Sequence, residues 1–69
     1  MTELDSALAH VKATDRALRE ARDDQAAALR DRDQAVRRAH KLGASYRQIA
    51  SLLGVAHNHV YEICNPEKR

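Results

Sequence analysis

The sequence predicts an all-α protein in which a long N-terminal helix, a possible coiled coil, precedes a compact head of short helices. Three observations support this prediction. The first forty of the 69 residues contain neither glycine nor proline, so nothing in them forces a break in a helix. The chain lacks Phe and Trp and is rich in Ala, Leu, Arg and Asp, which suits helices with a thin aliphatic core better than a sheet. Apolar residues also recur at helical spacing, and the length allows one small domain.

An apolar stripe along residues 1–33 predicts a helix used for self-association. Thr2 and Asp5 place a capping hydroxyl and an acidic group in the first turn, where the helix dipole favours both. The stripe consists of Leu4, Leu8, Val11 and Leu18. It is narrow and flanked by alanine, so a helix built on it must pack against something else. We expect these four residues to form a homodimer contact.

The path of the chain near Asp23 and Asp24 admits two geometries. A single helix of about forty residues, roughly 60 Å long, could leave the head and pair with a second copy. Alternatively, Asp24 could cap a new helix starting at Gln25, and the two halves would then fold as a hairpin. We favour the continuous helix, because nothing between Arg22 and Gln25 forces a turn.

Residues 34–66 are expected to form the compact head, and residues 67–69 a short tail. Gly43 ends the first segment, and Ser45 begins a short helix with Gln48 three residues later, in the order of a capping box. Gly54 ends that helix after about two turns. A further helix is predicted from about His57 to Cys64, and the Asn65-Pro66 pair ends it.

The two short helices have the sequence pattern of a helix-turn-helix unit. Ala50 is the small residue required where the helices cross, and Gly54, four residues later, tolerates the positive φ of a tight turn. The apolar residues expected to hold the helices together are Ile49, Leu53, Val55, Val60 and Ile63. Through these positions, residues from about 34 to 66 resemble the helix-turn-helix DNA-binding family. The likeness extends to the C-terminal domain of resolvase and invertase recombinases, and to short bacterial regulators in which one long helix precedes such a unit. The 69 residues contain no catalytic recombinase domain, so we expect only DNA binding to carry over.

The resemblance implies which residues would contact duplex DNA. In such units the second short helix enters the major groove, and its early exposed residues meet base edges. The base-contact candidates are Ala56, His57, Asn58, Tyr61 and Glu62. Asn58 could pair with adenine, and Glu62 could accept from the cytosine amino group. The phosphate-contact candidates are Ser45, Tyr46 and Arg47, together with Arg37, Arg38 and Lys41 on the preceding helix.

Two positions depart from the common pattern. Such helices often have serine where Ala56 stands and a basic residue where Glu62 stands. The predicted recognition helix therefore contains no Lys or Arg, and its positive charge depends on His57 and His59, which are mostly neutral near pH 7. We expect weak binding by one copy and tighter binding by a dimer on two half-sites.

Other chemistry has little support in the sequence. A chain this short rarely forms a pocket of convergent groups, so we expect neither catalysis nor a cofactor. The histidines and Cys64 lack CxxC or HxxxH spacing, so no metal site is expected. A lone cysteine, the lack of a signal-peptide pattern and the lack of an apolar run of roughly 18 residues indicate a cytoplasmic protein without a membrane span.

The distribution of charge agrees with a DNA-binding head. Residues 1–29 contain four basic and six acidic side chains, whereas residues 30–42 contain five basic and two acidic ones. A polyanion would therefore be attracted toward the head. We predict a small sequence-specific DNA-binding protein, a transcriptional regulator or accessory factor of a bacterium, phage or plasmid, that associates with the nucleoid when bound. The alternative is a protein-interaction module that uses the same scaffold without touching DNA.

Overall fold

The structure, a computed structural model, describes residues 2–66 and contains four helices in that range. These are α1 (Glu3–Glu20), α2 (Gln25–Lys41), α3 (Tyr46–Leu53) and α4 (His57–Cys64). No strand occurs in the described part of the chain, so the all-α prediction is confirmed. Nor does any helix between residues 2 and 66 have the length and apolarity needed to cross a membrane. The predicted tail, residues 67–69, lies outside the described residues.

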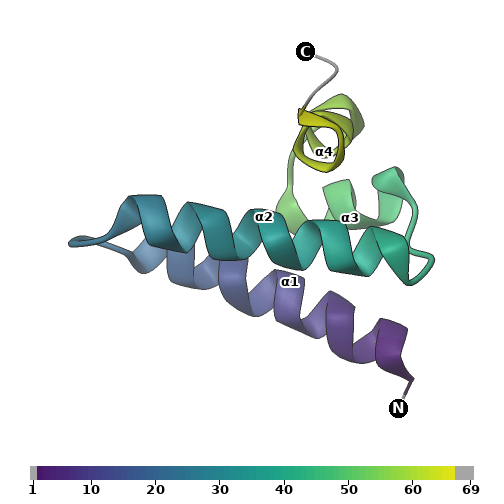
Figure 1. Ribbon diagram of the computed structural model, residues 1–69, viewed down its shortest axis with the longest axis horizontal. Helices are drawn as coiled ribbons and strands as arrows, with labels where there is room; N and C mark the ends of the chain where they lie inside the picture. Colours follow the sequence, from purple (N-terminus) through teal and green to yellow (C-terminus); the bar gives the residue numbers. More distant parts are fainter. Residues whose placement is uncertain (1, 67–69) are drawn as a thin grey trace.

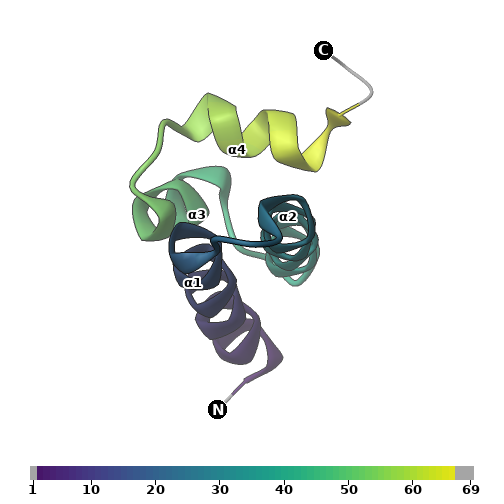
Figure 2. The ribbon, with the colours of Figure 1, turned by 90° about the vertical axis from the view of Figure 1, so that its left-hand side faces the viewer.

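The helices form two layers. Helices α1 and α2 lie side by side and antiparallel, joined at one end by a short loop (Figure 1). Helix α3 packs on both of them, and α4 crosses α2 and α3 on the side of the bundle away from α1 (Figure 2). Within residues 2–66, α1 and α4 make no contact. One face of α4 is therefore left open, while α1 supports the head from the opposite side.

The continuous N-terminal helix favoured from the sequence is wrong, and the hairpin is the observed geometry. Helix α1 ends at Glu20, Ala21 is extended, and Arg22 and Asp23 form a bend. Asp24 then caps α2, its Oδ1 accepting a hydrogen bond from the backbone N–H of Ala27 at 3.0 Å. A capping aspartate and intramolecular packing thus break the helix without glycine or proline. The boundary expected at residues 33 and 34 falls inside α2.

The predicted dimer seam is occupied by the chain's own packing. Val11 is fully buried, and Leu4 and Leu8 pack against the core that α1 shares with α2 and α3. Leu18 on the same helix is half-buried. The physical reason is the fold-back at Asp24, which gives the narrow stripe a partner without a second copy. Val11, Leu4 and Leu8 are therefore at least partly covered within one copy of the chain.

A single core joins the hairpin to the head. It contains Ala7 and Val11 of α1, Ala35, Val36 and Ala39 of α2, Ala44 of the following loop, Ile49, Ala50 and Leu53 of α3, and Val60 and Ile63 of α4. Four of the five apolar residues expected to hold the two short helices together are buried as predicted. Val55 is the exception, because it lies in the turn and is 36% exposed. Three of the five buried core residues that α1 and α2 contribute are alanines, namely Ala7, Ala35 and Ala39.

Candidate nucleic-acid interface

Helices α3 and α4 are joined by the turn that the sequence predicted. Gly54 has φ +71° and ψ +33°, in the left-handed region, and its N–H donates to the oxygen of Ala50 at 2.8 Å. Ser45 caps α3, with its hydroxyl accepting from the N–H of Gln48 at 3.0 Å. Ala50 is buried at 5% exposure beneath the crossing. The local geometry is therefore a short helix, a glycine turn and a second short helix.

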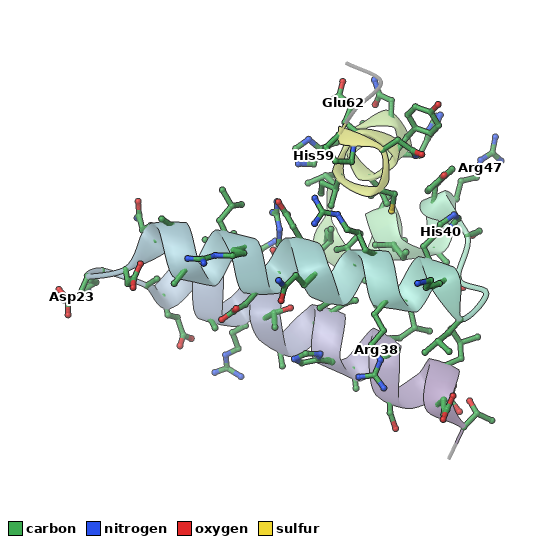
Figure 3. The ribbon with its side chains drawn as sticks, viewed as in Figure 1. Asp23, Arg38, His40, Arg47, His59 and Glu62 are labelled. Atoms are coloured by element: carbon green, nitrogen blue, oxygen red, sulfur yellow. The ribbon has the colours of Figure 1, made fainter. Side chains whose placement is uncertain are left out.

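The outward face of α4 presents the predicted base-contact residues. Val60 and Ile63 point into the core, whereas the five candidates are all exposed: Ala56, His57, Asn58, Tyr61 and Glu62. Glu62 projects away from the bundle, and His59 lies to one side of it (Figure 3). Ala56 stands at the N-cap without a side-chain hydrogen bond, as its lack of a hydroxyl predicted. The first N–H groups of α4 consequently have no capping side chain.

The structure separates the predicted phosphate contacts into two groups. Ser45 and Arg47 are exposed at the start of α3, and Arg47 projects outward beside α4 (Figure 3). Lys41 is exposed at the last residue of α2. Arg38, by contrast, points away from α4 and lines a shallow hollow between α1 and α2 together with His10. In this view Arg47 thus lies on the same side of the α1–α2 hairpin as α4, and Arg38 points to the opposite side.

Arg37 serves the head as a structural contact. Its Nε donates a hydrogen bond to the backbone oxygen of Ile63 at 2.9 Å. This oxygen belongs to the last turn of α4, where the helix dipole favours a positive charge. Arg37 therefore ties α2 to the C-terminal end of α4. The guanidinium assigned from the sequence to phosphate already has a partner within the fold.

Tyr46 is also held within the fold, although the sequence suggested a phosphate contact. Its ring stacks on His40 with centroids 4.3 Å apart and meets the ring of Tyr61 edge-on at 5.5 Å. Its hydroxyl accepts a hydrogen bond from Nδ2 of Asn65 at 3.2 Å. Tyr46 is half-buried, and Tyr61 is 41% exposed. Tyr46 therefore joins the end of α2 to one flank of α4.

Cys64 and the histidines form no reactive or metal-binding cluster within residues 2–66. Cys64 is half-buried at the end of α4 and packs against the core. Burial raises the pKa of its thiol, which outweighs the opposing effect of the Arg37 charge. A thiol with a raised pKa forms little of the nucleophilic thiolate near neutral pH. The arrangement suits packing rather than covalent chemistry.

Three residues that shape the candidate face were missed in the sequence. His40 stacks on Tyr46, and its Nδ1 lies 2.9 Å from the oxygen of Ala44. Asn65 links Tyr46 to α4, and Arg19 of α1 donates to the oxygen of Leu53 at 3.0 Å. No local pattern marks such long-range contacts. The only signal in the sequence for the aromatic contacts was the presence of His40, Tyr46 and Tyr61 in or next to the predicted helices.

Comparison with protein-family models, with curated proteins and with solved structures found no match to this chain. The candidate interface is therefore defined by its own geometry and chemistry.

Proposed function

We propose that this chain is a sequence-specific duplex-DNA-binding protein that places the exposed face of α4 in the major groove. The observation that carries the proposal is that α3 and α4, two short helices, are joined at Gly54 in the left-handed conformation, as a helix-turn-helix unit requires. Helix α4 is free on its outer side, and a helix of this kind fits the width of the major groove. Asn58 and Glu62 offer the amide and carboxylate that recognise base edges.

The charges around the face fit phosphate contacts on its flank. Arg47 projects beside α4, and Ser45 stands at the helix start, where a hydroxyl and backbone N–H groups can meet phosphate (Figure 3). Lys41 adds a further exposed charge. Because α4 itself has no Lys or Arg, one copy would bind weakly. Two copies on two half-sites would bind more tightly. Val11 would not take part in the contact between the copies, because it is fully buried within one chain.

Duplex binding at low and rising salt tests this proposal. We expect binding to random duplex at low salt that weakens steeply as salt rises, and tighter binding to a sequence selected from a random pool. Light scattering of the free and bound protein gives the number of copies. Failure to bind any duplex at low salt would overturn the proposal.

A protein-interaction module is the second candidate. It is favoured by the acidic Glu62 in the middle of the exposed face and by the exposed apolar groups of Val55 and Tyr61. A protein partner would contact the same face without depending on Arg47. If the protein is folded but binds no duplex DNA, this alternative would be favoured.

A further inference from the structure

We propose that Tyr46 is a positioning residue that sets the rotation of α4 about its axis, and thereby decides which side chains meet the bases. This inference rests on the proposed DNA-binding function. It assigns to Tyr46 a role in sequence discrimination in place of the phosphate contact expected from the sequence.

Helix α4 needs such a contact because its own restraints are few. It has eight residues, too short to be stable alone, and its N-cap Ala56 makes no side-chain hydrogen bond. Only Val60 and Ile63 are buried, and both lie on one side of the helix. Apolar packing on a single side holds the helix against the bundle but restrains its rotation weakly, because hydrophobic contact is not directional.

Tyr46 supplies a directional contact on the flank of α4. Nδ2 of Asn65 donates both to the Tyr46 hydroxyl at 3.2 Å and to the oxygen of Tyr61 at 3.0 Å. The ring of Tyr46 meets that of Tyr61 edge-on, a favoured arrangement of two aromatic rings. Tyr61 and Asn65 are one helical turn apart, so Tyr46 contacts two points along the same flank of α4.

The other side of Tyr46 is fixed by the end of α2. Its ring stacks on His40, and His40 lies within hydrogen-bonding distance of the Ala44 oxygen through Nδ1. Tyr46 therefore contacts the end of α2 as well as the flank of α4. Arg37 adds a second fixed point where it donates to the Ile63 oxygen at the end of α4.

The rotation of α4 matters for discrimination between DNA sequences because side chains that read base edges must be positioned precisely. Binding groups must be held within about 0.5 Å and 10–20° of their productive geometry. Asn58, Tyr61 and Glu62 occupy one exposed face at helical spacing, so a rotation of α4 displaces all of them together. Phosphate contacts from α3 would not move with that rotation, because Arg47 belongs to a different helix.

The test compares Tyr46→Phe with Arg47→Ala, its neighbour on α3. Tyr46→Phe keeps the stack on His40 and removes only the hydroxyl. We expect it to weaken binding to the selected site by about three- to tenfold, the range of one lost hydrogen bond, and to leave random-duplex binding unchanged. Arg47→Ala should weaken both duplexes alike. Asn65→Ala should weaken selected-site binding at least as much as Tyr46→Phe, because it also removes the hydrogen bond to the Tyr61 oxygen. The double variant should lose no more than Asn65→Ala alone.

Each result decides the role of Tyr46. Equal losses on both duplexes would show that the Tyr46 hydroxyl contacts phosphate, and an unchanged selected-site affinity would show that it positions nothing. Both outcomes overturn the inference. Hydrogen exchange of the free protein supplies a readout without DNA, in which α4 amides should exchange faster in Tyr46→Phe while α1 and α2 amides do not change. If the parent binds no duplex, the proposed function fails, and unchanged α4 exchange would then overturn the positioning role separately.

Discussion

Arg19 on α1 donates a hydrogen bond from Nη2 to the backbone oxygen of Leu53 on α3 at 3.0 Å, across 34 positions of the chain. The same guanidinium nitrogen lies 3.1 Å from Oδ2 of Asp15, which is only 8% exposed. Asp15 also faces Arg32 of α2 at 3.9 Å. One small polar network therefore connects α1, α2 and the residue directly before the Gly54 turn. The α1–α2 hairpin is thereby joined to α3 by directional contacts as well as by the alanine-rich core.

The Arg19 contact predicts a measurable share of the stability. Arg19→Met keeps the aliphatic stem but removes the hydrogen bond to Leu53 and leaves Asp15 with one fewer partner. We expect the free energy of unfolding to fall by about 0.5–1.5 kcal/mol in urea titrations. Arg16→Met is the matched control on the same helix, because Arg16 pairs only with exposed Glu20, and its effect should stay below about 0.5 kcal/mol. If Arg19→Met and Arg16→Met lowered the free energy of unfolding equally, the hydrogen bond to Leu53 would not stabilise the fold.

The hairpin makes opposite predictions for two adjacent aspartates. Asp24→Ala removes the cap of α2 and should lower the free energy of unfolding by about 1 kcal/mol. Asp23→Ala changes an exposed bend residue without a cap and should have an effect below about 0.5 kcal/mol. Thermal or urea unfolding followed by circular dichroism measures both. In a continuous helix, Asp24→Ala would raise stability instead, because alanine is the better residue in a helix interior.

Substitution of Gly54 should destabilise the fold only through the backbone conformation that this position requires. A Cβ built at this position meets nothing within 4 Å, so any destabilisation follows from φ +71° rather than from a clash. Gly54→Ala should lower stability by about 1–2 kcal/mol, and β-branched Gly54→Val by more. Gly54→Asn is the control, since asparagine accepts the left-handed conformation more readily. Identical melting temperatures for the valine and asparagine variants would be incompatible with this turn.

The short-range features of the fold could be predicted from the sequence, because each depends on neighbouring residues. Ser45, Gly54 and the Asn65-Pro66 pair marked the helix ends where the structure has them. The sequence could not decide between the hairpin and the continuous helix. It showed that Asp24 could cap a new helix, but the choice between the two geometries depends on packing between remote segments. Whether Ala7 and Val11 meet a second copy or α2 depends on the distance between remote segments, which no local pattern encodes.

The candidate site was predicted in part for the same reason. The outward face of α4 followed from the positions of Val60 and Ile63, since exposed and buried sides of a helix are fixed by its period. The sequence assigned Arg37 to phosphate as a positive charge on the leading helix, and Tyr46 because it stands at the start of the first short helix. Their partners, the Ile63 oxygen and Asn65, lie 26 and 19 positions away in the chain. A long side chain with such a distant partner has no signature in the sequence.

Asn58 and Arg47 separate recognition of bases from contact with phosphate. Asn58 lies on the outer side of α4, opposite buried Val60 and Ile63, where an amide can meet adenine N6 and N7. Asn58→Ala should weaken binding to the selected site by about 1–3 kcal/mol and leave random duplex nearly unaffected. Arg47→Ala should weaken both duplexes and make the salt dependence shallower by about one unit per head. Fluorescence anisotropy over a series of salt concentrations gives both quantities.

His59→Ala is the matched control for Asn58→Ala, because His59 is exposed on the same helix but lies to the side of the proposed base-contacting face (Figure 3). It should change neither affinity nor salt dependence. Circular dichroism establishes that each variant keeps the helicity of the parent, which matters because α4 has only two buried side chains. A folded Asn58→Ala protein that binds its selected site as tightly as the parent would show that a different side of α4 enters the groove. A loss with His59→Ala in place of Asn58→Ala would identify that side, because the two residues are neighbours separated by about 100° around the helix.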